Sequence, residues 1–255
     1  MFDISKEQIK NYLNDFSVLY HQQNFTKNNG GMKFPQLFGT YCILKEIKPS
    51  LIIESGIWKG LGTWMIEKTL PESKIISFDI DLSNREYISD DVTYIENDIS
   101  SIEWKEFFKD YPDESLENSL LFLDDHVDFS DRLNFLKDNR FKHIIDEDNY
   151  PSQQGDCISP KKILDGNECI IDKGGNRKSL KLDTKLKDEF NSIIKDYWEF
   201  PPIYLPPKTR WGDSFDNYNI KSPIFDTITD EIIEYKDFDN YTWICYMETV
   251  DNDCR

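Results

Sequence analysis

Hydrophobic residues near the N-terminus recur with the spacing of two amphipathic helices. The first stripe follows Ser5, which has capping-box spacing to Gln8, and consists of Ile9, Leu13, Phe16 and Tyr20. The second begins at Pro35, ends before Pro49, and consists of Leu37, Tyr41, Leu44 and Ile47. The pattern therefore predicts two helices in front of the first strand.

From Leu51 onward, short apolar runs alternate with helical patterns. The runs predict strands over residues 51–54, 75–79, 92–96, 119–123 and 142–146, and the helical patterns lie over 62–70 and 128–139. Continuous apolar runs fit strands buried on both faces, and helical crossovers imply parallel neighbours. The expected fold class is α/β, with a doubly wound, Rossmann-like sheet that is mostly parallel.

The alternation is lost beyond Pro151. We expect Gly- and Lys-rich turns over 165–178, a helix over 183–198 and a proline-rich loop over 200–207. The last apolar runs, 232–235 and 241–247, are close enough in sequence for an antiparallel hairpin near the C-terminus.

Composition narrows the class of partner. The chain has 255 residues, a net charge of −18 from 48 acidic and 30 basic residues, and 14% aromatic residues, which support a packed core. An acidic surface repels phosphate backbones, and basic runs are no longer than pairs such as Lys161-Lys162, so we expect no nucleic-acid partner. The sequence has no long apolar run and no basic-then-apolar leader, so we expect a soluble, cytoplasmic protein without a membrane partner.

Cysteine and histidine usage excludes two further classes. The five cysteines are scattered and include no CxxC pair, which suits a reducing compartment better than a disulfide framework. The three histidines show no HExxH spacing, which argues against a zinc site of the usual kind.

A glycine-rich turn stands between the first strand and the helix that follows it. The segment 54–63 reads Glu-Ser-Gly-Ile-Trp-Lys-Gly-Leu-Gly-Thr, and the next strand ends in Asp79-Ile80-Asp81. Glycines let the backbone approach a ligand, and an acid at the next strand end accepts hydrogen bonds from ribose hydroxyls. The turn lacks the Lys-Ser/Thr of a Walker A loop, and Met65 breaks the GxGxxG pattern, which disfavours ATP and NAD.

The two segments 54–63 and 78–81 resemble the first and second motifs of class I S-adenosylmethionine-dependent methyltransferases. The resemblance implies that Gly56 and Gly60 make room for the methionine moiety, and that Glu54 helps to hold its cationic end. It also implies that Asp79 binds the ribose, while Asp98 stands where the family often places an adenine contact. The candidate cofactor-binding residues are Glu54, Gly56, Gly60, Thr63, Asp79, Asp81 and Asp98. The alternative is that the glycines only close a tight turn and that Asp98 is a cap or turn residue.

A second group of acids follows the fourth and fifth strands, at residues 124–125 and 146–148. The carboxyl ends of neighbouring parallel strands share one crevice, so the two groups should face each other. Crowded carboxylates require protons or a cation, and oxygen ligands suit Mg²⁺, Mn²⁺ or Ca²⁺. The candidate metal ligands are Asp124, Asp125, Glu147, Asp148 and Asn149. The alternative is that these acids cap helices or form a solvated rim.

This layout resembles metal-dependent O-methyltransferases of the catechol O-methyltransferase type, and more closely the cephalosporin hydroxylase-like group. Members of that group pair an Asp after strand four with Glu-Asp after strand five. The resemblance covers roughly residues 30–150 and implies a bound Mg²⁺ or Mn²⁺. The catechol-type pattern has a lysine base three residues after the strand-four Asp, where this chain has Val127 or Asp128. His126 is the available substitute, and His126 with Asp125 are the catalytic candidates.

The expected function is therefore an S-adenosylmethionine- and metal-dependent O-methyltransferase that acts on a small hydroxylated acceptor, such as a sugar or a natural product. Two alternatives stay open: a non-catalytic, methyltransferase-like binding module and an NAD-dependent oxidoreductase. Acceptor selectivity is assigned to the irregular region, including Arg210 and Trp211, and homo-oligomerisation is left open. We expect one domain, with N-terminal helices in 1–50, a cofactor-binding core in 51–150, a substrate-binding insertion in 151–228 and the hairpin in 229–255.

Overall fold

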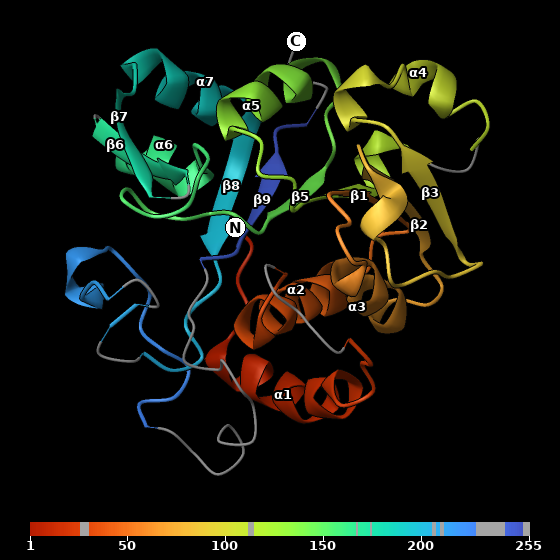
Figure 1. Ribbon diagram of the computed structural model, residues 1–255, viewed down its shortest axis with the longest axis horizontal. Helices are drawn as coiled ribbons and strands as arrows, with labels where there is room; N and C mark the ends of the chain where they lie inside the picture. The colour runs from red at the N-terminus through yellow and green to blue at the C-terminus, as the bar shows by residue number, and fades with distance from the viewer. Residues whose placement is uncertain are drawn as a thin grey trace.

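Seven strands of the described chain form one sheet, in the order β3-β2-β1-β4-β5-β9-β8 (Figure 1). Their bounds are Leu51–Ser55 (β1), Lys74–Asp79 (β2), Val92–Glu96 (β3), Ser119–Leu123 (β4), His143–Asp146 (β5), Ile194–Glu199 (β8) and Cys245–Thr249 (β9). Strands β1 to β5 pair in parallel, and β9 runs antiparallel to both β5 and β8. The predicted doubly wound, mostly parallel α/β fold is confirmed; the predicted C-terminal run forms β9, which is antiparallel to β5 and β8, while the other arm of the predicted hairpin, 232–235, lies outside the described residues.

The computed structural model describes residues 1–25, 31–111, 115–166, 168–173, 175–205, 208–209, 212–227 and 243–251. The predictions made for residues 232–235, Arg210 and Trp211 lie outside these ranges. Within them, no helix combines the length and the apolar character needed to cross a lipid bilayer.

Helices cover both faces of the sheet (Figure 1). Their bounds are Lys6–Tyr20 (α1), Phe34–Ile47 (α2), Leu61–Thr69 (α3), Trp104–Phe107 (α4), Phe129–Asp138 (α5), Pro160–Asp165 (α6) and Thr184–Ile193 (α7). One core cluster packs α1, α2 and α3 against sheet residues such as Ile52, and the other packs α4, α5 and α7 against residues such as Ile53. Successive residues of β1 thus enter opposite cores, which explains why the strand reads as a continuous apolar run.

The first two helices form as their sequence pattern predicts. The hydroxyl of Ser5 accepts a hydrogen bond from the backbone N–H of Gln8 at 3.1 Å, which satisfies a donor that the first turn of α1 leaves free. Three residues of the α1 stripe, Ile9, Leu13 and Phe16, are buried and Tyr20 is half-buried, while α2 is buried over most of its length.

Two predictions beyond Pro151 were wrong. The helix predicted over 183–198 ends at Ile193, because the following residues pair with β9 as the edge strand β8. The turns predicted over 165–178 are an antiparallel hairpin of Glu168–Lys173 (β6) and Asn176–Lys181 (β7). The Gly-Gly pair between these strands is a hairpin signal that the sequence contains.

Candidate active site

The loop after β1 is fixed by a carboxylate and by a close approach of two strands. The Asp79 Oδ2 atom accepts hydrogen bonds from the backbone N–H groups of Ile57 at 2.8 Å and Trp58 at 3.0 Å. Gly56 has a φ of +94°, and a Cβ atom there would lie 1.9 Å from the backbone oxygen of Asp124. Glycine is therefore required at position 56 by the chain's own backbone, whether or not a ligand is bound.

Two of the predicted cofactor residues lie beneath this loop. Glu54 and Thr63 are both fully buried, and the Thr63 hydroxyl donates to Glu54 Oε2 at 2.7 Å. Burial raises the pKa of Glu54 to about 7, because a low-polarity environment disfavours the charged carboxylate, although hydrogen bonds from Ser77 and Thr63 oppose this shift. The contact of Glu54 with the cationic end of a cofactor stays a prediction.

The raised pKa predicts a pH-dependent stability for the Glu54→Gln variant. The folded-state pKa of about 7 exceeds the ordinary value of 4.5, so the folded chain binds the extra proton and loses stability as the pH rises between these values. Glutamine keeps the acceptor for Thr63 but carries no charge. The free energy of unfolding of the variant relative to wild type should therefore increase by about 3 kcal/mol between pH 4.5 and pH 8. Urea titrations at both pH values measure it, and a difference that does not change with pH would contradict the assignment.

A cavity of about 460 Å³, here called the glycine-loop cavity, opens at the carboxyl ends of β1, β2 and β3. Three of the candidate cofactor-binding residues, Gly56, Asp79 and Asp98, line this cavity together. The remaining predicted cofactor residues, Glu54, Gly60, Thr63 and Asp81, do not line it. Gly60 instead begins α3 with a φ of +89°, and Asp81 Oδ1 accepts from the backbone N–H of Ser83 at 2.8 Å.

A buried arginine joins two walls of the glycine-loop cavity. The Arg132 side chain on α5 is 2% exposed, and its Nη2 lies 2.6 Å from Asp125 Oδ2. Its Nη1 donates to the Ser100 hydroxyl at 2.9 Å and lies 3.6 Å from Asp98 Oδ1. Burial opposes ionisation of Asp98, but hydrogen bonds from Ser100 and the Arg132 charge outweigh it and lower the pKa of that carboxyl. Nothing local in the sequence points to this long-range role of Arg132.

The predicted ligand Asp125 is held by this ion pair and is not part of the metal-binding geometry. Its Oδ1 also accepts from the backbone N–H of Val127 at 3.1 Å, which closes the turn after β4. Both carboxylate oxygens therefore have protein partners, and the role of Asp125 as a metal ligand and catalytic group stays a prediction.

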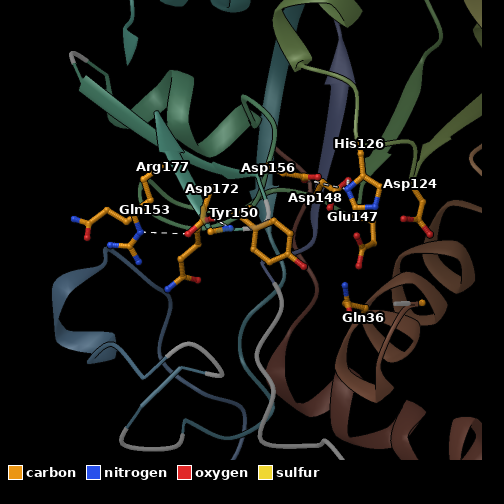
Figure 2. Close-up of a pocket in the computed structure, with 14 residues that line it drawn as sticks. Gln36, Asp124, His126, Glu147, Asp148, Tyr150, Gln153, Asp156, Asp172 and Arg177 are labelled. Carbon is orange, nitrogen blue, oxygen red and sulfur yellow. Dashed lines mark hydrogen bonds and ion pairs between the residues drawn. The ribbon is translucent and has the colours of Figure 1, made fainter. Parts of the chain in front are cut away.

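Asp124, His126 and Asp148 form a cluster in which one ligand atom of each residue lies within 4.8 Å of the others (Figure 2). His126 has a φ of +55°, so the turn after β4 bends sharply and brings the ring to the end of β5. Its Nδ1 lies 3.3 Å from Asp148 Oδ2 and 3.1 Å from Asp156 Oδ1. The sequence predicted that the two strand ends face each other, and this is confirmed.

The three side chains of the cluster shift one another's pKa values. Burial, and then the charge of Asp148, raise the pKa of Asp124 well above its usual range, and burial likewise raises the pKa of Asp148. The hydrogen bond to Asp156, with the charge of Asp148, raises the pKa of His126 to about 10. A protonated imidazole donates and does not accept, so His126 can act as a base only after it loses this proton, and that role stays a prediction.

The other two predicted ligands differ from each other. Glu147 is 4% exposed and hydrogen-bonds to Asp148, so it lies beside the cluster. Asn149 turns away: its Nδ2 donates to the Tyr197 hydroxyl at 2.8 Å, and its Oδ1 accepts from the backbone N–H of Lys161 at 2.8 Å. The first turn of α6 leaves N–H groups without helical partners, and Asn149 satisfies one of them. Its role as a metal ligand stays a prediction, with both ends of its amide engaged by the protein.

A second cavity of about 380 Å³, here called the hairpin cavity, lies between the end of β5 and the β6–β7 hairpin (Figure 2). Its lining residues are Gly31, Gln36, Asp124, His126, Glu147, Asp148, Tyr150, Gln153, Gln154, Gly155, Asp156, Asp172, Gly175 and Arg177. Lys162 is 1% exposed and supports this wall, since its Nζ donates to the backbone oxygens of Gln154 and Cys157. No motif or spacing indicates this role of Lys162.

The two cavities meet at the cluster. Gly31, Asp124 and His126 line both of them. A ligand in the glycine-loop cavity and a second ligand in the hairpin cavity would therefore approach each other beside these side chains. This arrangement suits a transfer reaction between two bound molecules.

No protein-family model matches the sequence, and no curated protein matches it. Among solved structures, the apo structure of CmcI is 16% identical, with a TM-score of 0.37, and the match covers 52% of this chain and 64% of that one. The Burkholderia thailandensis 1,6-didemethyltoxoflavin-N1-methyltransferase with bound S-adenosylhomocysteine is 8% identical, with a TM-score of 0.45 and coverage of 98% and 92%. The SAH-bound Podospora anserina methyltransferase PaMTH1 is 12% identical, with a TM-score of 0.45 and coverage of 98% and 99%. At such low TM-scores and identities, these likenesses do not assign a function to this chain.

Proposed function

We propose that this protein is an S-adenosylmethionine-dependent methyltransferase that methylates a hydroxyl group of a small acceptor with the help of a divalent cation. The observation that carries the proposal is the meeting of the two cavities at Asp124 and His126. The glycine-loop cavity contains Gly56 and Asp79, which belong to the two motifs that resemble those of class I methyltransferases. The hairpin cavity is the site of the acceptor.

The donor set fits Mg²⁺ or Mn²⁺, held by Asp124, Asp148 and His126, whose ring would give up its proton to the cation. Asp148 is 5% exposed, and its Oδ2 accepts no hydrogen bond from the described part of the chain, although it lies 3.3 Å from His126 Nδ1. Two carboxylates this close, one of them buried, favour a cation between them, and the imidazole nitrogen suits Mn²⁺ somewhat better than Mg²⁺. When bound, such a cation lowers the pKa of an acceptor hydroxyl as a Lewis acid.

The chain's own residues contribute alignment and charge. In the transfer, the acceptor oxygen forms a bond to the methyl carbon while the carbon–sulfur bond breaks, so the sulfonium becomes a neutral thioether. The hydroxyl proton passes to a carboxylate that lines the hairpin cavity. Asp79 holds the loop after β1, and Arg132 holds the opposite wall of the glycine-loop cavity. Because these walls are already ordered, the sulfonium and the acceptor can be aligned without a large loss of entropy during the reaction.

Binding of the demethylated cofactor tests the first half of the proposal. Isothermal titration calorimetry with S-adenosylhomocysteine should show one site, and the affinity should be the same in EDTA, because the cation contacts the acceptor. If no binding occurs, the proposal fails. If the cofactor binds but no hydroxylated acceptor is methylated in the presence of Mn²⁺, the non-catalytic alternative is favoured.

The Asp79→Ala variant gives a sharper form of this test. The substitution removes acceptors for the ribose hydroxyls and also the two hydrogen bonds that hold the Ile57–Trp58 backbone. We expect the binding free energy of S-adenosylhomocysteine to weaken by about 1–3 kcal/mol, the usual loss for hydrogen bonds to a charged group. Asp91→Ala, at an exposed position before β3, is the matched control. Equal affinities in the two variants would show that Asp79 has no part in binding.

A further inference from the structure

The lining of the hairpin cavity is almost entirely polar. Among the described residues that line it, none has an aliphatic side chain, and Tyr150 supplies the one phenol ring. Amide side chains come from Gln36, Gln153 and Gln154, and the remaining side chains are ionisable. An acceptor rich in hydroxyl groups would find hydrogen-bond partners among these side chains.

One amide offers a specific acceptor. Gln154 is 1% exposed, and its Nε2 donates to the Tyr218 hydroxyl at 2.8 Å. Its Oε1 has no hydrogen-bond partner within the described residues. A buried amide oxygen without a partner is rare in folded proteins, and in a cavity wall it points to a ligand that donates a hydrogen bond.

The charge of the cavity is negative, and its cationic groups are already paired. Five carboxyl groups line it, from Asp124, Glu147, Asp148, Asp156 and Asp172, against two cationic groups, from His126 and Arg177. Arg177 Nε lies 3.2 Å from Asp172 Oδ2, and His126 Nδ1 lies 3.1 Å from Asp156 Oδ1. A divalent cation would still leave the carboxylates in excess. An anionic acceptor therefore meets repulsion, while a cationic group is attracted.

The charged groups also lie at two separate ends. Figure 2 shows Asp124, His126 and Glu147 at one end, Asp172 and Arg177 at the other, and the Tyr150 ring between them. The Asp172 side chain is 27% exposed and is remote from the cluster in this view. A ligand with its hydroxyl beside the cluster would thus place its far end near Asp172.

We infer that the acceptor is a polyhydroxylated molecule that carries an amino group, with the ammonium directed to Asp172 at the hairpin end of the cavity. The same charges disfavour molecules with carboxylate or phosphate groups, including nucleotide-activated sugars. This inference rests on the proposed function, because the proposed function places the acceptor in the hairpin cavity.

Three probes share one sugar ring and differ in charge: D-glucosamine, D-glucose and D-glucuronate. Their dissociation constants are measured by saturation-transfer NMR on the full chain with Mn²⁺ replaced by diamagnetic Mg²⁺ and with S-adenosylhomocysteine present. We expect glucosamine to bind about fivefold more tightly than glucose, the size of effect that a partly exposed charge contact provides. Glucuronate should bind more weakly than glucose.

The Asp172→Asn variant tests the position of the ammonium. It should abolish the preference for glucosamine and strengthen glucuronate binding, because Arg177 loses its carboxylate partner. Asp188→Asn, an equal change of charge at an exposed position on α7, is the control and should keep the wild-type order. Binding of S-adenosylhomocysteine is measured in parallel. Loss of that binding would show that the proposed function fails, independently of the sugar affinities.

The inference is overturned if glucuronate binds as tightly as glucosamine, or if none of the three sugars binds. It is also overturned if Asp172→Asn leaves the order of affinities unchanged. Normal S-adenosylhomocysteine binding in any of these cases would leave the cofactor assignment intact and remove only the assignment of the acceptor.

Discussion

Replacement of Asp148 by asparagine is expected to lower methyl transfer by at least about 100-fold, because loss of groups that merely support metal ligands already lowers activity by about 10–100-fold. Asp148 contributes a buried carboxylate to the cluster with Asp124 and His126. Asparagine keeps the shape but removes the negative charge that favours a divalent cation. The affinity for S-adenosylhomocysteine should stay within about twofold of wild type, since Asp148 does not line the glycine-loop cavity.

Thermal unfolding provides a readout for this variant that does not depend on activity. Mn²⁺ should raise the melting temperature of wild type, because a ligand that binds only the folded state stabilises it by mass action. The increase should be largely lost in Asp148→Asn and kept in Asp138→Asn, an exposed control at the end of α5. Full activity of wild type in EDTA, or an equal response of both variants to Mn²⁺, would contradict the metal assignment.

Replacement of Gly56 by alanine is expected to reduce the free energy of unfolding by about 3–5 kcal/mol, from steric overlap and from a left-handed backbone. The new Cβ would lie 1.9 Å from the backbone oxygen of Asp124, so the strand ends of β1 and β4 must separate. Such a shift moves Asp124 away from the cluster. Chemical denaturation measures the first effect, and Mn²⁺ affinity measures the second.

Gly212→Ala separates the two causes. Gly212 has a φ of +92°, close to that of Gly56, but no atom of the described residues lies within 4 Å of a Cβ placed there. The control therefore reports the backbone strain alone, about 1–2 kcal/mol. If both variants lose the same stability, the contact with Asp124 is not what requires glycine at position 56.

The parallel core was predictable because its signals are local. Residues 119–123 form a continuous apolar run, and every residue of β4 is buried between two helical layers. The closeness of the acids at the ends of β4 and β5 was also predictable, since adjacent parallel strands end at the same edge of the sheet. These features depend on residues close together in the sequence.

The errors have a common physical origin in contacts between distant residues. Residues 194–199 form a strand because β9, about fifty residues further along, supplies their hydrogen bonds. The partners of the acids and amides at the strand ends are equally hard to foresee: Arg132 pairs with Asp125, and Tyr197 and Lys161 bind Asn149. An acid or amide at a strand end has several available partners, and only the folded chain determines which one it meets.

A crystal structure with S-adenosylhomocysteine and Mn²⁺ tests the central claim most directly, because anomalous scattering locates the metal independently of the protein. We expect one Mn²⁺ bound by Asp124, His126 and Asp148, with the cofactor in the glycine-loop cavity beside Gly56, Asp79 and Asp98. Cofactor density in the hairpin cavity, or a manganese peak away from these three side chains, would contradict it.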